Sequence, residues 1–267
     1  MADDSQEILS SDAELLKDTV RDAGALALSL FRTELKNWTK GASSPVSEAD
    51  IAVNDLLEAR LRSATPDYGW LSEESVDDAE RLGKRLTWIV DPIDGTRGYL
   101  AGREDWCVSV ALVEDTAPVL AAVFVPVAGE FFFATRGQGA MLNERRIEAT
   151  AGTSLDFSRI AGPKPLVERL KTEAGEIALY PRIGSLALRL CRVAQGHLDA
   201  AFAGGNSRDW DLAAAHLIVQ EANGRMTALS GEGILYNRRE VTHGVLVAAG
   251  RDRHASIVSH LRKTSPA

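Results

Sequence analysis

The chain has 267 residues, of which 45% are hydrophobic and 25% charged, and its formal net charge is −8. This composition is typical of a globular protein, and the length suits one large domain or two closely joined halves. The acidic balance argues against binding to a nucleic acid polymer, which needs a basic surface. No apolar run reaches the ~20 residues of a membrane-spanning helix, and the N-terminal segment lacks the apolar stretch of a signal peptide. Cys107 and Cys191 have no metal-type spacing, which predicts buried free thiols in a reducing compartment. We therefore expect a cytoplasmic protein that does not contact a membrane.

The first part of the chain predicts two helices followed by a group of strands. Apolar residues recur at helical spacing from Ser11 to Phe31, and a second helix begins at Ser47 and runs to about Leu61. The segment between them, Lys36–Gly41, is expected to be a loop whose lysines either meet a substrate phosphate or are simply solvated. Two strands are then expected at Tyr68–Leu71 and Arg85–Val90. The strands expected after them are Trp106–Val113, Pro118–Val125 and Glu130–Ala134, and glycine and proline separate the later ones, which predicts consecutive hairpins of a mixed or antiparallel sheet.

From about Arg159 the pattern changes to short strands that alternate with helices, which indicates a second α/β half. We therefore divide the chain into residues 1–154 and 155–267. The expected strands are Arg159–Ala161, Ile177–Leu179, Leu198–Phe202, Arg225–Ala228 and Val245–Ala248. The expected helices are Leu166–Thr172, Ser185–Ala194, Asp211–Ala222 and His254–Leu261.

The predicted strand that ends at Val90 leads directly into two carboxylates. Because Pro92 has no N–H for a sheet ladder, we expect regular pairing to end there. Asp91 and Asp94 then lie at the carboxyl end of a strand, a common position for active sites in α/β proteins. Gly95 allows backbone amides to approach a ligand closely. Two oxygen ligands beside amide donors suit a divalent cation that holds a phosphate.

Other polar residues lie at element ends and have two interpretations each. Asp50 has the spacing of a variant capping box with Ser47, so it is either a helix cap or a functional carboxylate. Ser185 either caps its helix or faces an anion, and Asp211 lies at a helix start, where its charge is favourable. Glu73 follows a short predicted strand.

Convergence of the acidic residues Glu73, Asp91, Asp94 and Asp211 would require either raised pKa values or bound cations, because like charges repel strongly in a partly buried site. Oxygen-only ligands favour Mg²⁺, Mn²⁺ or Ca²⁺ over zinc, and Mg²⁺ fits best.

Four stretches, in order, resemble the inositol monophosphatase family of metal-dependent phosphatases, and the resemblance extends from about the first helix to near the C-terminus. They are Pro45-Val46-Ser47-Glu48-Ala49-Asp50, Ser72-Glu73-Glu74-Ser75, Asp91-Pro92-Ile93-Asp94-Gly95-Thr96 and Trp210-Asp211-Leu212-Ala213-Ala214-Ala215. The resemblance implies a layered αβαβα sandwich of mixed α/β class. It also implies hydrolysis of a phosphomonoester by a metal-activated water, and inhibition by lithium.

The same resemblance implies roles for individual residues. Two or three Mg²⁺ ions, with Mn²⁺ as a substitute, would be held by Glu73, Asp91, Asp94, Asp211 and the backbone carbonyl of Ile93. The catalytic residues would be Asp50, Thr96 and Glu73, of which the first two resemble the pair that orients and activates the attacking water. Substrate contacts would come from Gly95, Thr96, Ser185 and Asp211.

The substrate is predicted from smaller features. Arg97–Glu104 and Val108–Leu112 resemble the branch that removes the 3′-phosphate of 3′-phosphoadenosine 5′-phosphate. Inositol phosphatases commonly carry a glutamate six residues before the Trp-Asp motif, where this chain has Gly204. We therefore expect a 3′(2′),5′-bisphosphate nucleotidase. The alternatives are an inositol-1-phosphate or other polyol phosphate phosphatase and, more remotely, a metal- or nucleotide-binding regulator without turnover. The expected partner is a small phosphorylated metabolite, and a homodimer is expected because homologous folds often dimerise.

Overall fold

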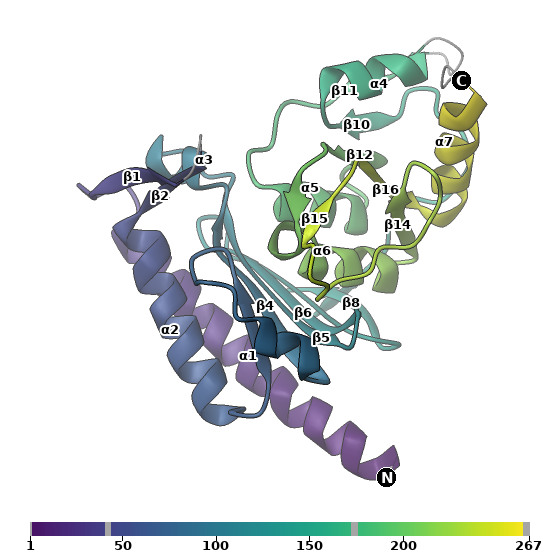
Figure 1. Ribbon diagram of the computed structural model, residues 1–267. Coiled ribbons are helices and arrows are strands. Elements are labelled where there is room, and N and C mark those ends of the chain that lie inside the picture. Colours follow the sequence, from purple (N-terminus) through teal and green to yellow (C-terminus); the bar gives the residue numbers. More distant parts are fainter. Residues whose placement is uncertain (1, 41–43, 172–175, 264–267) are drawn as a thin grey trace.

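The computed structural model describes residues 2–40, 44–171 and 176–263, which form five stacked layers (Figure 1). In order, the layers are a helix pair, a seven-stranded sheet, a second helix pair, a five-stranded sheet and an outer helix pair. This arrangement confirms the predicted αβαβα sandwich. Among the described residues, no helix combines the length and the apolar character that a membrane crossing requires.

The first layer consists of α1 (Ala2–Leu30) and α2 (Glu48–Ala64). Both predicted helices are confirmed, and α1 begins earlier than expected. The apolar stripes of the two helices bury against one face of the seven-stranded sheet, as the four-residue spacing of Leu16 and Val20 on α1 and of Val53 and Leu57 on α2 requires.

A strand pair lies between these helices, where we predicted a loop. The antiparallel strands are β1 (Asn37–Lys40) and β2 (Ser44–Ser47). The prediction was wrong because β1 is short and largely exposed and both strands lack an apolar alternation, the signal on which the prediction depended. Gly41, the end of the predicted loop, lies outside the described residues.

The seven-stranded sheet has the order β3-β4-β5-β6-β7-β8-β9, with β3 and β4 parallel and all other neighbours antiparallel. Helices cover both faces, so central strands such as β4 read as nearly continuous apolar runs. The strands are β3 (Gly69–Ser72), β4 (Leu86–Asp94), β5 (Cys107–Glu114), β6 (Ala117–Val125), β7 (Glu130–Thr135), β8 (Gly139–Leu142) and β9 (Arg145–Ile147). Two short helices flank β4, namely η1 (Ala79–Gly83) before it and α3 (Thr96–Leu100) after it.

The middle helices, α5 (Leu186–Ala194) and α6 (Asp209–Glu221), lie between the two sheets. One apolar cluster includes residues from both sheets and both helices. Ala213, Ala214 and Ala215 are buried along α6, where their small side chains allow close packing against the sheet. The two halves of the chain therefore share a core.

The five-stranded sheet has the order β11-β10-β12-β16-β14, with β10 parallel to both of its neighbours and the other pairs antiparallel. Its strands are β10 (Arg159–Ala161), β11 (Ala178–Leu179), β12 (Ala200–Ala203), β14 (Gly224–Ala228) and β16 (Leu246–Gly250). Its outer face is covered by α4 (Lys164–Lys171) and α7 (Arg251–Lys263). The predicted helix end at Thr172 lies outside the described residues.

A separate short pair, β13 (Ser207–Arg208) with β15 (Thr242–His243), lies at the start of α6. The seven-stranded sheet ends at Ile147 and the five-stranded sheet begins at Arg159, so the predicted division after residue 154 falls in the connection between them. The division itself stays a prediction, because the shared core is continuous between the sheets.

Candidate active site

The carboxyl end of β4 contains a β-bulge. Asp91 pairs with Ser109 of β5 and Asp94 pairs with Cys107, so one strand has an extra residue between the two pairs. Pro92, which has no N–H to donate, lies within the bulge. We predicted that regular pairing would end at Pro92. The pairing is interrupted there, but it resumes at Asp94, because the bulge absorbs the proline without ending the strand.

Gly95 turns the chain from β4 into α3. Its φ of 101° lies in the left-handed region, and a Cβ there would lie 3.1 Å from the carbonyl oxygen of Asp105 and 3.3 Å from the backbone nitrogen of Ser185. Glycine therefore satisfies both the backbone conformation and the close approach of two other segments. Gly95 and Thr96 line the cavity formed at this turn.

This cavity has a volume of about 170 Å³ and contains acidic side chains from three elements. Asp91, Asp94 and Asp211 each place a carboxylate oxygen within 4.8 Å of the others, and Glu73 also lines the cavity. Oδ1 of Asp91 is buried and has no hydrogen-bond partner. Buried polar atoms in folded proteins are almost always paired, so this oxygen calls for a partner such as a cation.

The electrostatics of the cluster agree with its geometry. Burial raises the pKa of Asp91 well above its usual value, and repulsion from Glu73, Asp94 and Asp211 raises it further. Burial and repulsion from Asp94 likewise raise the pKa of Asp211 well above its usual value. In both cases the ionised form is disfavoured unless positive charge enters the cavity.

The start of α5 donates two hydrogen bonds to Asp94. The hydroxyl of Ser185 and the backbone N–H of Ala187 both donate to Oδ2 of Asp94 at 2.6 Å. Burial raises the pKa of Asp94, and these two hydrogen bonds partly oppose the shift. The Ser185 hydroxyl also accepts from the N–H of Leu188 at 2.9 Å, so the helix-cap interpretation of Ser185 is confirmed. Its hydroxyl is fully buried behind Asp94, while Gly184 lines the cavity, and its predicted substrate contact stays a prediction.

Asp50 combines the two interpretations that its sequence position allowed. Its Oδ2 accepts from the backbone N–H and the hydroxyl of Ser47 at 2.8 and 2.6 Å, which is the helix-cap interaction. Its Oδ1 accepts from the hydroxyl of Thr96 at 3.0 Å. Burial raises the pKa of Asp50, although the bonds from Ser47 and Thr96 lower it in part. Asp50 and Thr96 are therefore brought together, as the resemblance implied, beside the acidic cavity.

Asp211 is the third residue of α6 and reaches the cluster from the other half of the chain. Its Oδ2 accepts from the backbone N–H of Arg208 at 2.6 Å, which fixes the carboxylate in a capping position. The structure thus brings together every residue predicted to hold metal, since Glu73, Ile93 and the three aspartates all line one cavity.

Sequence reasoning missed the arginines at the cavity. Arg97, Arg103 and Arg182 line it alongside the carboxylates. Arg103 donates to both carboxylate oxygens of Asp105 at 3.1 Å. A Cβ added to Gly98 or Gly184 would lie 3.3 or 2.6 Å from Nη2 of Arg103, so these two glycines leave room for its guanidinium. Arg97 could have been found from the sequence, because it directly follows the Asp-Gly-Thr motif. The position of Arg103 could not, because the glycines beside its guanidinium, Gly98 and Gly184, are far apart in the chain.

Lys40 provides a further cation near Glu73. Its ammonium donates to the backbone carbonyl of Glu73 at 3.1 Å and also pairs with Glu74. Burial lowers the pKa of Lys40, and the charges of Glu73, Asp50 and Asp91 oppose that shift. The basic segment before α2 therefore reaches the site, although as a strand and not as the predicted loop.

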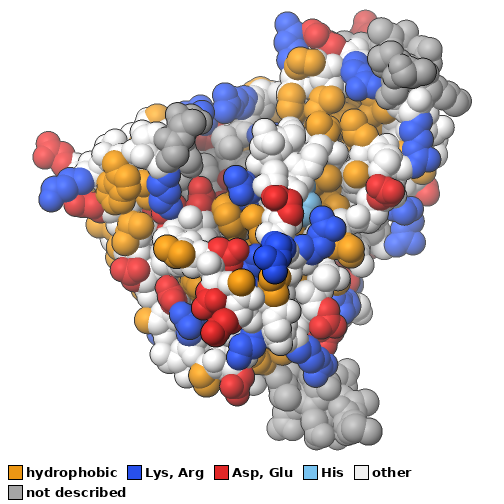
Figure 2. All heavy atoms as spheres, viewed as in Figure 1, with side chains coloured by type: hydrophobic (Ala, Val, Ile, Leu, Met, Phe, Trp, Pro, Cys, Tyr) orange, Lys and Arg blue, Asp and Glu red, His pale blue; other side chains and the backbone are white. Residues whose placement is uncertain are grey.

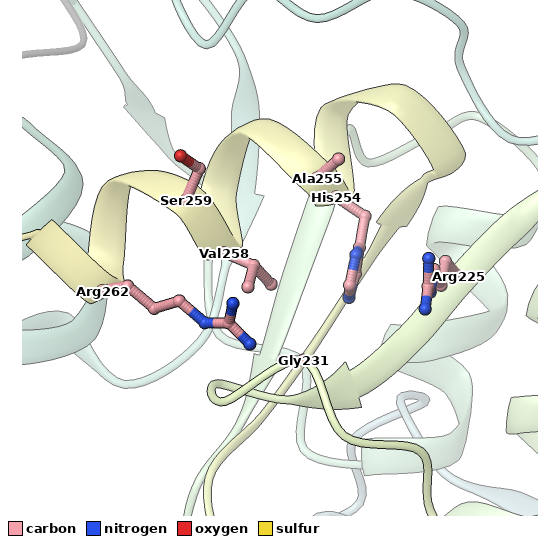
Figure 3. Close-up of a pocket in the computed structure, with 7 residues that line it drawn as sticks. All are labelled: Arg225, Gly231, His254, Ala255, Val258, Ser259 and Arg262. Atoms are coloured by element: carbon pink, nitrogen blue, oxygen red, sulfur yellow. The ribbon is translucent and has the colours of Figure 1, made fainter.

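Larger cavities exist elsewhere, but among the described residues only the cavity at β4 combines three carboxylates that lie close enough to hold one metal ion. One of about 470 Å³ lies between β14 and α7, where Arg262 and His254 project toward Gly231 and Arg225 (Figure 3). None of the described residues that line it carries a carboxylate. On the face shown in Figure 2, acidic and basic side chains of the described residues are interspersed and form no basic stripe. The acidic cavity at β4 is therefore the candidate active site.

Comparisons with known proteins agree with this geometry. The model of the inositol monophosphatase family matches residues 8–265. The chain is 32% identical over 242 residues to an inositol-1-monophosphatase of Caulobacter vibrioides, covering 86% of this chain and 92% of that one. It is 39% identical over 197 residues to the Nus factor SuhB of Xylella fastidiosa, covering 69% of each. The crystal structure of the extragenic suppressor protein SuhB from Bartonella henselae superposes with a TM-score of 0.83 at 27% identity, covering 96% of this chain and 100% of that one.

The chain belongs to the inositol monophosphatase family. Members of this family are metal-dependent phosphatases, and the chain is accordingly a phosphomonoesterase with an acidic cluster that can bind metal.

Proposed function

We propose that this protein is a Mg²⁺-dependent phosphatase of inositol 1-phosphate or a closely related polyol phosphate. The observation that carries the proposal is the buried, unpartnered Oδ1 of Asp91 within a group of three converging carboxylates. The choice of substrate is supported by the family match and by the inositol-1-monophosphatase from Caulobacter vibrioides, which covers most of this chain.

The donor set of the cavity fits a magnesium site. Asp91, Asp94, Asp211 and Glu73, with the carbonyl of Ile93, offer only oxygen atoms, which Mg²⁺ and Mn²⁺ prefer. Two or three bound ions would offset the repulsion among the carboxylates and polarise the phosphate. The backbone at Gly95 and Thr96 would then orient the phosphate at the cavity wall.

Asp50 and Thr96 provide a route for the proton of the attacking water. The Thr96 hydroxyl has one hydrogen and two acceptors at 3.0 Å, Oδ1 of Asp50 and the carbonyl of Ile93. When it donates to Asp50, its oxygen can accept a hydrogen bond from water in the cavity. As the water oxygen bonds to phosphorus, its proton passes to Thr96 and the Thr96 proton passes to Asp50. The bond from phosphorus to the alcohol oxygen breaks, and the departing alkoxide takes a proton from solvent. Burial, which raises the pKa of Asp50, favours this acceptance.

The test is release of phosphate in the presence of Mg²⁺, with inositol 1-phosphate and 3′-phosphoadenosine 5′-phosphate assayed side by side. The quantity compared is kcat/KM, because it measures discrimination between substrates. We expect inositol 1-phosphate to be preferred. Hydrolysis of neither substrate by metal-loaded, folded protein would contradict the proposal.

A 3′(2′),5′-bisphosphate nucleotidase, the function preferred from the sequence alone, is the second candidate. The comparisons favour the inositol alternative, since the relatives are named as inositol-1-monophosphatases or SuhB proteins. The second candidate is supported by Arg97, Arg103 and Arg182 at the cavity, because guanidinium groups suit a second phosphate. It is also supported by Gly204, which replaces the acid that commonly meets inositol hydroxyls. A higher kcat/KM for the bisphosphate would select this candidate.

We also propose that the protein works in the cytoplasm. Both cysteines are buried and unpaired, which suits a reducing compartment. The predicted homodimer stays a prediction.

A further inference from the structure

Asn237 lies where the two halves of the chain meet, near the start of β4 and therefore at the opposite end of this strand from Asp91 and Asp94. Asn237 belongs to the segment between β14 and β15, which runs past α6 toward the seven-stranded sheet in Figure 1. It is 6% exposed, and its φ of 53° lies in the left-handed region, which asparagine tolerates better than most residues. No function assigned above uses it.

The side chain of Asn237 bonds to the half that carries Asp91 and Asp94. Its Nδ2 donates to Oγ1 of Thr87 at 3.2 Å and to the carbonyl of Asp115 at 3.4 Å. Thr87 lies on β4, four residues before Asp91, which corresponds to about 13 Å along a strand.

The same side chain also bonds to the segment that follows Glu73. Oδ1 of Asn237 accepts from Nη1 of Arg81 at 2.8 Å, and Arg81 is 2% exposed. Arg81 holds Asp77 through two further hydrogen bonds of 2.6 and 2.9 Å. Because Asp77 is four residues from Glu73, this ion pair restrains the loop that brings Glu73 into the cavity.

The backbone of Asn237 bonds to the element that carries Asp211. Its N–H donates to Oδ2 of Asp209, the first residue of α6, at 2.8 Å. The other oxygen of Asp209 lies 2.6 Å from Nε2 of His243 on β15. Asp209 is 1% exposed and precedes Asp211 by two residues, so this bond fixes the first turn of α6.

We propose that Asn237 is a positioning residue that sets the placement of Asp211 relative to Asp91, Asp94 and Glu73. Its hydrogen bonds go to Arg81, Asp209, Thr87 and Asp115, none of which lines the cavity. It ties together the three elements that carry the acidic residues, namely β4, the loop after β3 and α6. The consequence is that metal affinity depends on Asn237, since Mg²⁺ and Mn²⁺ tolerate little deviation in the geometry of their ligands. The inference rests on the proposed metal site.

The decisive variant is Asn237→Gly. Glycine adopts a positive φ freely and keeps the N–H that bonds Asp209, so the change removes only the side-chain bonds to Thr87, Asp115 and Arg81. The matched control is Asn223→Gly. Asn223 has a φ of 60°, is exposed, and makes no side-chain hydrogen bond with the described residues.

The measurement is calorimetric binding of Mn²⁺ to metal-free protein, with a thermal unfolding curve to establish that each variant is folded. We expect Asn237→Gly to weaken Mn²⁺ binding about tenfold, the low end of what removal of outer-shell partners of metal ligands costs. Asn223→Gly should bind as the wild type does. Equal affinities in the two glycine variants would overturn the positioning role while leaving the metal site intact. Absence of Mn²⁺ binding in the wild type would overturn the proposed site and this inference together.

A second variant decides the question if Asn237→Gly does not fold. Thr87→Val replaces the acceptor hydroxyl by a methyl group of similar volume, and it removes only the bond between Asn237 and β4. We expect weaker Mn²⁺ binding than in the wild type, with a smaller change than in Asn237→Gly. Wild-type affinity in folded Thr87→Val would overturn the inference.

Discussion

Two buried carboxylates in this protein, Asp91 and Asp199, have pKa values that are shifted in opposite directions. Burial acts to raise the pKa of Asp199, but hydrogen bonds from Arg159 and Thr150 outweigh it and lower the pKa. Around Asp91, burial raises the pKa and the neighbouring charges raise it further. Asp199 is 9% exposed and Asp91 is 1% exposed, so burial alone does not explain the difference.

The difference lies in the partners. Asp199 accepts from the backbone N–H of Arg159 at 2.8 Å, from its guanidinium at 3.0 Å and from the Thr150 hydroxyl at 2.9 Å. Asp91 is surrounded by acids, and its Oδ1 has no partner. A carboxylate with its own cations stabilises the fold, whereas a carboxylate among acids costs stability until a cation binds. The comparison therefore distinguishes a structural acid, Asp199, from the proposed metal ligand Asp91.

The largest effect on activity is expected from Asp91→Asn. Loss of the central carboxylate removes several kcal/mol of transition-state stabilisation, and about 4 kcal/mol corresponds to ~10³-fold in rate. We expect kcat/KM for the preferred phosphomonoester to fall by at least ~10³-fold, measured by phosphate release at saturating Mg²⁺. Unchanged turnover in folded Asp91→Asn would show that Asp91 is not a metal ligand needed for the reaction.

A smaller loss of activity is expected from Thr96→Val, which removes the hydroxyl between Asp50 and the cavity but keeps the shape of the side chain. Positioned proton transfer contributes about 10²–10⁴-fold, so we expect kcat to fall about 10²-fold. Mn²⁺ affinity, measured calorimetrically, should stay unchanged because the cluster carboxylates are intact. Thr96→Ser retains the hydroxyl and is the control. An equal loss in Thr96→Ser would show that the hydroxyl is not the active group.

Asp199→Asn should affect stability and leave activity unchanged. It weakens the bonds from Arg159 and leaves partly buried donors poorly paired, which costs about 1 kcal/mol. The free energy of unfolding should fall by about this amount in urea denaturation. Specific activity of the folded protein should match the wild type. A large loss of kcat without destabilisation would break the comparison between the two acids.

The smallest expected effect is on the pH dependence of stability, in which the cluster acids and Asp199 should act in opposite directions. Because the folded protein raises the pKa of Asp91, Asp94 and Asp211, the unfolded chain loses these protons first as the pH rises. In metal-free protein this contribution to stability is therefore present below the unfolded pKa and is lost as the pH rises through the folded pKa. Asp199 acts in the opposite direction, since its lowered pKa adds stability above the unfolded pKa and loses it in acid.

The measurement is urea unfolding of metal-free wild type and Asp91→Asn from about pH 5 to about pH 8. The wild type should lose stability relative to Asp91→Asn as the pH rises. Equal pH dependence of the unfolding free energy in the two proteins would contradict a raised pKa of Asp91 in the folded state.

The order of the longer helices and strands follows from the sequence because apolar spacing and glycine or proline punctuation determine it locally. The short strands β8, β9, β13 and β15 were not predicted, because two to four residues are too few to show a period. The β-bulge does not, because Pro92 signals an interruption of pairing and the resumption at Asp94 depends on the partner strand. The strand pair β1–β2 was missed for a similar reason, since its pairing is not encoded in an apolar pattern.

The acidic residues of the site were predictable because each lies at the end of a strand, just after a strand or in the first turn of a helix, within a recognisable motif. The position of Arg103 at the cavity and the hydrogen bonds of Asn237 could not be predicted. Arg81 and Asn237 are 156 residues apart in the chain, and their hydrogen bond exists only in the folded structure. Side chains that act through tertiary contacts leave no local signal in the sequence.

The most direct test of the central claim is the melting temperature of wild type and Asp91→Asn at neutral pH, with and without saturating MgCl₂. If the acidic cluster costs stability until a cation binds, Asp91→Asn melts at a higher temperature than the wild type without metal. The order then reverses with Mg²⁺, because only the wild type gains the binding energy. A wild type that is the more stable protein without metal, and that gains nothing from Mg²⁺, would contradict the account.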